Sequence, residues 1–194
     1  LLYSGGLDTS TILKWLQDIY QVKVVALTID IGQIADDLLQ IKQKALDLGA
    51  IDAITLDAKD KFAKDYIALA IKANASYQGE YYLSTPLGRA VISEEAVKIA
   101  ADQNIKYIAH GCTGKGNDQV RFESYITTLN PKLKVIAPVR EWGMGRDEQI
   151  AYAKKHDIPI LQSNKKPYSY DDNMWGSTAE GGEIEHPEEI PHLE

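Results

Sequence analysis

Hydrophobic positions along this chain follow two patterns that alternate. Residues 8–20 carry apolar side chains at positions 12, 13, 16, 19 and 20, a spacing typical of an amphipathic helix. Residues 22–30 form the run VKVVALTID, whose β-branched side chains indicate a buried strand. The same reasoning predicts further helices at 36–48, 59–75, 91–103, 118–129 and 146–156, and further strands at 53–56, 106–109 and 134–137.

This alternation predicts an α/β fold, a Rossmann-like parallel sheet with helices on both faces, which we assign to residues 1–160. In such sheets, ligands bind at the carboxyl ends of the strands. Glycine-bearing segments at 4–10, 30–33 and 110–117 each follow a predicted strand. We therefore expect all three segments to meet in one crevice.

The two ends of the chain depart from this pattern. Only residues 1–3 precede the first glycine loop, and strands usually have about 5–6 residues, so we expect the chain to start inside its first strand. Residues 163–194 are rich in proline, glycine and charge and show no periodicity. We predict that 161–194 form a linker and the beginning of a second, incomplete domain whose remainder is absent.

Composition narrows the expected partners and compartment. The 194 residues carry a formal net charge of −7, which argues against a nucleic-acid surface, because such surfaces need clustered lysine and arginine. Cys112 is the single cysteine, so no intrachain disulfide can form and we expect a reducing, cytoplasmic location. No apolar run approaches the roughly 20 residues that span a membrane, so we expect no membrane partner.

The sequence SGGLDTS at residues 4–10 lies between a strand stub and a predicted helix. Paired glycines allow a tight turn, and the N–H groups of a first helical turn attract anions. The loop lacks the features of Walker A and dinucleotide-binding loops, and it resembles the PP-loop of ATP pyrophosphatases, which cleave ATP between the α- and β-phosphates. The alternative is an ordinary capped turn. Asp8 alone suits either a helix N-terminus or a Mg²⁺ site.

A second polar loop, HGCTGKGNDQVRFE, occupies residues 110–123. Donors and acceptors follow one another closely in it, at Thr113, Asn117, Asp118 and Arg121. An arginine can bind a carboxylate in a forked geometry and an aspartate can accept from an ammonium group, so the cluster suits an amino-acid ligand. The alternative is a solvated loop with helix-capping residues.

Three other residues of this loop have simpler interpretations. His110 has no neighbours at metal-ligand spacing, and a structural role is favoured. Cys112 is expected to serve as a small residue rather than as a nucleophile. For Lys115, two interpretations are equally favoured: its charge helps to neutralise bound phosphates, or it is simply an exposed, solvated lysine.

Taken together, these segments resemble the argininosuccinate synthase family. The resemblance includes SGGLDTS at 4–10, IDIGQ at 29–33, NASYQGEYYLSTPLGR at 74–89, HGCTGKGNDQVRFE at 110–123, APVREW at 137–142, and KPYSYDDN with AEGG in the tail. It covers essentially the whole chain. The family's subunits are much longer, so the resemblance implies an N-terminal ATP pyrophosphatase (PP-loop) domain followed by the start of a synthetase domain.

The resemblance implies an ATP-dependent ligase that condenses citrulline with aspartate to argininosuccinate and releases AMP and pyrophosphate. The citrulline ureido oxygen would attack the α-phosphorus of ATP, and the aspartate amine would then displace AMP from the citrullyl-adenylate. ATP and Mg²⁺ are the implied cofactors, and a homotetramer is the implied full-length assembly. This chain alone is expected to bind ATP yet to turn over poorly.

The resemblance also implies roles for individual residues. Those expected to bind ATP are Tyr3, Ser4, Gly5, Gly6, Leu7, Asp8, Thr9, Ser10, Ile29 and Gly111. Those expected to bind aspartate are Thr113, Asn117 and Asp118, and those expected to bind citrulline are Tyr81, Asn117, Arg121, Ser169 and Thr178. Asp8, Ser10 and Asp118 are assigned as catalytic, and no residue is assigned as a metal ligand.

Several positions depart from the family pattern. Leu2 and Ile29 stand where alanine is usual and add bulk near the expected nucleotide, Pro86 replaces a residue, usually serine, that contacts citrulline, and Thr178 replaces another serine. Two alternative functions remain: another PP-loop ligase, such as an amidotransferase-type synthetase or a tRNA-thiolating enzyme, or a non-catalytic ATP-binding module. The single cysteine and acidic charge oppose thiolation, and the polar cluster at 113–121 opposes a simple ATP sensor.

Overall fold

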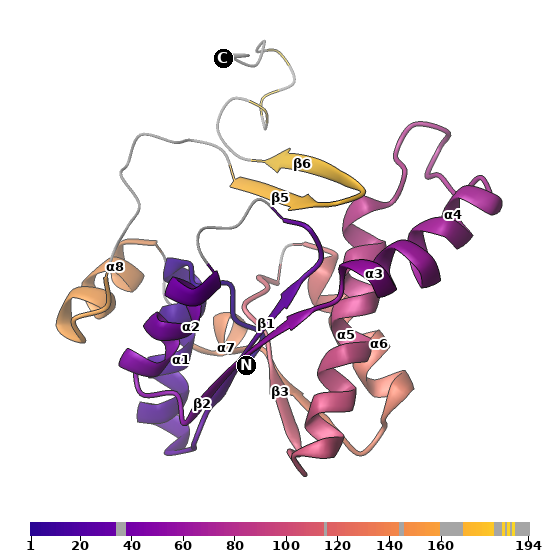
Figure 1. Cartoon of the computed structure of the whole chain (residues 1–194). Coiled ribbons are helices and arrows are strands. Elements are labelled where there is room, and N and C mark those ends of the chain that lie inside the picture. The colour runs from indigo at the N-terminus through magenta and orange to yellow at the C-terminus, as the bar shows by residue number, and fades with distance from the viewer. Residues whose placement is uncertain are drawn as a thin grey trace.

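The computed structural model describes residues 1–33, 38–114, 116–143, 146–159 and 169–180, together with residues 184, 186 and 188. Its strands are β1 (Val25–Asp30), β2 (Asp52–Asp57), β3 (Tyr107–Ala109), β4 (Lys134–Ile136), β5 (Ser169–Asn173) and β6 (Gly176–Glu180). Its helices are α1 (Leu7–Tyr20), α2 (Leu38–Asp47), α3 (Lys59–Lys61), α4 (Ala68–Lys72), α5 (Ser84–Asp102), α6 (Asp118–Leu129), α7 (Pro138–Glu141) and α8 (Arg146–Lys155), with a π-helical segment at Phe62–Ile67. From α1 to α8, helices and strands alternate broadly as predicted (Figure 1).

The N-terminal residues connect two pairs of parallel strands. β1 pairs with β2 along its whole length, and β3 pairs with β4. Leu2 forms a parallel bridge with Leu27 of β1, and the Leu2 N–H donates to the Ala109 carbonyl of β3 at 2.9 Å. The spatial order is therefore β2, β1, residues 1–3, β3, β4, and the first loop leaves from the middle of the sheet.

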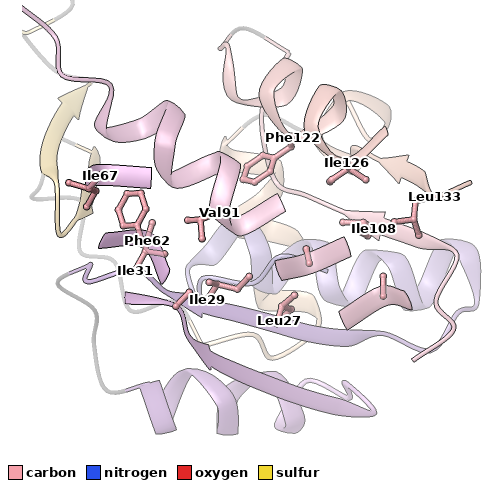
Figure 2. Packing of buried hydrophobic residues seen from close by; sticks show 13 residues of the cluster. Leu27, Ile29, Ile31, Phe62, Ile67, Val91, Ile108, Phe122, Ile126 and Leu133 are labelled. Atoms are coloured by element: carbon pink, nitrogen blue, oxygen red, sulfur yellow. The ribbon is translucent and has the colours of Figure 1, made fainter. Parts of the chain in front are cut away.

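Helices cover both faces of this sheet. Successive side chains of a strand point to opposite faces, so neighbouring residues of β1 pack in different clusters. Ala26 of β1 packs in a cluster with side chains of α1 and α2. Leu27 and Ile29 pack on the other face, where Figure 2 shows them with Val91 of α5 and Phe122 of α6. Each face thus has its own core, and the loops that follow the strands lie between the two helical layers.

Helix α5 begins at Ser84, before the predicted start at residue 91. Pro86 and Gly88 obscured the helical pattern in this stretch. A proline is tolerated in the first helical turn, because its missing N–H would have no partner within the helix. A Cβ on Gly88 would lie 3.1 Å from the Ile31 Cδ1, so the glycine allows α5 to pack closely against the end of β1.

Smaller differences concern the limits of other elements. The helix predicted at 59–75 consists of α3, the π-helical segment and α4, and it ends at Lys72. The strand predicted at 22–30 begins at Val25. Among the residues placed in the structure, no helix is both long and apolar enough to cross a membrane.

A β-hairpin occupies residues 169–180, where the sequence predicts no regular structure. β5 and β6 pair antiparallel and contact α5, and the Met174 N–H of their turn donates to the Ile31 carbonyl at 3.0 Å. Figure 1 shows the hairpin at the end of the sheet where β1 finishes. The predicted domain division near residue 160 stays a prediction, since 160–168 lie outside the described residues.

Candidate functional site

The loop at residues 4–10 joins the N-terminal stub to α1. Gly6 is the N-cap residue of α1 and no side chain caps this end, so the first helical turn suits a bound phosphate. Gly5 has a φ of +78°, a left-handed conformation that favours glycine. A Cβ on Gly5 would lie 2.9 Å from the Ile41 Cγ1 of α2, so the glycine also allows close contact with that helix.

A cavity of about 560 Å³, which we call the nucleotide cavity, opens beside this loop. Its walls include most residues predicted to bind ATP, namely Tyr3, Ser4, Gly6, Leu7, Asp8, Thr9, Ile29 and Gly111. Segments 4–10, 30–33 and 110–117 all contribute to it, so they meet in one crevice as predicted. Leu2 also lines this cavity, and both bulky departures from the family pattern therefore face the predicted nucleotide.

Gly5 and Ser10 are the two predicted ATP-binding residues that the structure does not bring to this cavity. Gly5 lines a separate cavity on the α2 side of the loop. Ser10 is fully buried, and its Oγ lies 3.0 Å from the Tyr3 hydroxyl. The Ser10 side chain therefore supports the loop from behind, and its catalytic assignment stays a prediction without geometric support.

A second cavity of about 510 Å³, which we call the amino-acid cavity, adjoins the first. The two cavities share the wall residues Asp8, Arg89, Gly111, Cys112 and Asp171. The amino-acid cavity gathers most residues predicted to bind aspartate or citrulline, namely Tyr81, Thr113, Asn117, Asp118, Arg121 and Thr178. The side chain of Ser169 and the whole of Lys115 lie outside the described residues.

An ion-pair network, formed by Thr85, Arg89, Asp118, Arg121 and Asp171, lines this cavity. Asp118 accepts from the Arg89 Nε at 2.8 Å and from the Arg121 Nη1 at 2.7 Å. Asp171 accepts from the Arg89 Nη2 at 2.7 Å and from the Thr85 hydroxyl at 2.9 Å. Burial alone would lower the pKa of Arg89, but the two carboxylates outweigh it and raise that pKa, so Arg89 stays charged.

Sequence reasoning missed three members of this network. Thr85 and Arg89 lie in the stretch that was not predicted as helical, and Asp171 lies in the tail. One signal was present, because Arg89 ends the segment at 74–89 that carries part of the family resemblance. The contacts across the cavity join residues that are far apart in the sequence, so only the fold brings them together.

The hairpin carries Thr178 to the amino-acid cavity, and several contacts fix it there. The Trp175 Nε1 donates to the Tyr82 carbonyl at 2.6 Å. At the hairpin turn, a Cβ on Gly32 would lie 2.7 Å from the Met174 Cβ. The loop after β1 therefore needs a glycine for the hairpin to pack this closely.

His110 and Cys112 both line the nucleotide cavity, and the His110 Nε2 lies 3.7 Å from the Glu123 Oε1, beyond hydrogen-bonding distance. His110 is 1% exposed, its Nδ1 accepts from the Cys112 N–H at 3.2 Å, and its ring stacks on Phe122. Burial lowers the pKa of His110 and raises the pKa of Cys112 to about 12. A neutral imidazole and a protonated thiol support the structural roles predicted for both residues.

Comparisons with known proteins agree with this geometry. Residues 1–159 match the family model described as "Arginosuccinate synthase N-terminal HUP domain". The chain is 51% identical to the argininosuccinate synthase of Brevibacillus brevis over 98% of this chain and 45% of that relative. It is 52% identical to the one of Dictyoglomus thermophilum over 98% and 48%, and 54% identical to the one of Picrophilus torridus over 96% and 46%. The chain thus spans about half the length of the curated relatives it matches, and the family match confirms the predicted α/β fold of the ATP pyrophosphatase type.

Proposed function

This chain belongs to the argininosuccinate synthase family, and from that premise we propose that it forms the ATP- and amino-acid-binding part of a ligase that joins citrulline to aspartate. The observation that carries the proposal is the shared wall of the two cavities. Asp8 and Gly111, predicted to bind ATP, line the cavity that also holds Asp118 and Arg121, predicted to bind the amino acids. A phosphate group and an amino acid bound in these cavities would be neighbours.

ATP would occupy the nucleotide cavity with its phosphates at the first turn of α1. The helix dipole and the N–H groups of that turn favour negative charge. The hydroxyls of Ser4 and Thr9, 3.2 Å apart, would add donors to the departing pyrophosphate. Leu2 and Ile29 would contact the nucleoside, and their bulk would narrow the space around it.

Mg²⁺ fits this site as a companion of the phosphates. Within the described ranges, no three His, Cys, Asp or Glu side chains gather closely enough to hold a metal by themselves. Protein-bound Mg²⁺ usually takes one or two carboxylates plus substrate phosphates, and Asp8 lines both cavities. Asp8 would therefore hold the ion, which would neutralise charge on the leaving pyrophosphate.

The chemistry would need little acid–base help from the protein. The citrulline ureido oxygen would bond to the α-phosphorus while the bond to the pyrophosphate oxygen breaks. The aspartate nitrogen would then attack the ureido carbon, lose a proton and expel AMP. Asp118, Arg121 and the neighbouring polar groups would orient the amino acids, so that the rate comes from placement and charge stabilisation. Homotetrameric assembly stays a prediction from the family resemblance, and a cytoplasmic location stays a prediction from the single cysteine.

Thermal unfolding of this chain with added ligands tests the proposal. A ligand that binds only the folded state raises the melting temperature, by about 5–10 °C at 100 times its dissociation constant for a chain of this size. ATP with Mg²⁺ is expected to raise it, and aspartate to raise it further. Asp118→Asn should lose the aspartate increment and keep the ATP increment. Absence of any ATP effect at millimolar concentration would contradict the proposal.

A further inference from the structure

We infer that Lys44 of α2 is a positioning residue for the phosphate-binding loop, because it holds the peptide between Gly5 and Gly6 in a single orientation. The inference rests on the proposed ATP-binding function and adds a residue that no family motif quoted above contains. Its starting point is one contact, in which the Lys44 Nζ donates to the Gly5 carbonyl oxygen at 2.8 Å.

The peptide between Gly5 and Gly6 is the least restrained part of the loop. Neither residue has a Cβ, so the plane of this peptide can rotate with little steric resistance. Every peptide bond in the described part of the chain is trans, and in a trans peptide the C=O and the following N–H point in opposite directions. With the Gly5 carbonyl held toward Lys44, the Gly6 N–H points away from α2, and Gly6 lies in the wall between the α2-side cavity and the nucleotide cavity.

Helix α2 also braces the loop by direct packing. Ile41 lies three positions before Lys44, so both side chains project from the same helix face. The Ile41 side chain packs directly against Gly5. A Cβ on Gly5 would lie 2.9 Å from the Ile41 Cγ1. Packing fixes the position of Gly5, whereas the Lys44 hydrogen bond fixes the direction of its carbonyl.

The surroundings of Lys44 make the contact testable. Lys44 is half-buried, and burial lowers the pKa of its ammonium group. It lines a cavity of about 540 Å³ on the α2 side of the loop, which leaves room for a replacement side chain. A Lys44→Met variant should therefore lose the hydrogen bond without displacing Ile41 or the loop by overpacking.

The test is calorimetric titration of this chain and its variants with ATP, with pyrophosphate and with AMP. Lys44→Met should weaken ATP and pyrophosphate binding about tenfold. This is the loss expected when the Gly6 N–H no longer points steadily at the charged phosphates and about one hydrogen bond to the ligand is lost. AMP lacks the β- and γ-phosphates, so its affinity should stay within about twofold of the wild type, which also shows that the variant is folded. Lys44→Arg keeps a cationic donor at this position and should recover most of the ATP affinity.

Lys42→Met is the matched control. Lys42 is an exposed lysine of the same helix, and at two positions from Lys44 it faces another direction. The Lys42→Met variant should bind all three ligands like the wild type. An equal loss of ATP affinity in both variants would show that the loss comes from the change in net charge, and would overturn the inference. Unchanged ATP binding by Lys44→Met, or an equal loss of AMP binding, would also overturn it. A wild-type chain that binds none of the three ligands would instead overturn the proposed function, and this inference with it.

Discussion

Replacing Arg89 with methionine removes the cation between Asp118 and Asp171 but keeps much of the apolar stem. The Arg89 side chain is 16% exposed, and those of the two carboxylates are 26% and 31% exposed. In solvent exposure, these ion pairs are intermediate between two known classes. Exposed pairs contribute about 0–1 kcal/mol to stability, and disrupting buried pairs costs about 3–5 kcal/mol. Each carboxylate keeps one partner, Arg121 or Thr85. We expect a loss of about 2–3 kcal/mol in the free energy of unfolding, which lowers the melting temperature by about 4–12 °C.

Urea unfolding followed by circular dichroism measures this loss. Lys64→Met is the control, because Lys64 pairs with Asp60 at 2.7 Å but the two side chains are 71% and 79% exposed, so its loss should leave the free energy of unfolding close to the wild-type value. The double variant Arg89→Met with Asp171→Asn should be less destabilised than the sum of the single variants, because it also removes the negative charge that loses its cation in Arg89→Met. An Arg89→Met variant no less stable than Lys64→Met, or strictly additive single effects, would refute the reasoning.

Three further predictions concern the walls of the site. Gly32→Ala should destabilise the protein by about 1–3 kcal/mol in urea unfolding, because Gly32 has a φ of +83° and the new Cβ would clash with Met174; wild-type stability would contradict this. Cys112 should react with iodoacetamide at pH 8 much more slowly in the folded than in the urea-unfolded chain, because burial raises its pKa to about 12; equal rates would contradict this. Burial keeps the pKa of His110 below its unfolded value of 6.5, so the unfolded state takes up the proton first and stability falls as the pH falls below about 7. His110→Gln should show a shallower fall between pH 7 and pH 5, and parallel stability curves for the two proteins would contradict the assignment.

The alternating part of the fold was predictable because each element carries its own signal. A strand such as β1 is a run of β-branched residues, and helices such as α2 and α6 show an apolar face at helical spacing. The loop at 4–10 was also predictable as an anion site, since its function depends on backbone N–H groups and on glycines at fixed positions. Parallel strands then bring their following loops to one edge, so the meeting of segments 4–10, 30–33 and 110–117 followed from topology.

The remainder depended on contacts between distant segments. The start of α5 contains Pro86, which a first helical turn tolerates, and Gly88, whose local preference opposes a helix and is overridden by packing against the end of β1 and the hairpin. The hairpin itself has no strong apolar alternation in its sequence. In the structure it contacts α5 and Ile31, which are distant in the sequence, so a local pattern could not predict it. The network around Arg89 joins α5, α6 and β5, so no spacing in the sequence could reveal it.

Pyrophosphate release tests the central claim most directly. The assay uses this chain extended at its C-terminus with the second half of the Brevibacillus brevis relative, with ATP and Mg²⁺ present and citrulline or aspartate omitted in turn. The account predicts that release requires citrulline and that sustained turnover to AMP requires aspartate as well. Release that is indifferent to both amino acids, in an extended protein that is folded and binds ATP, would contradict it.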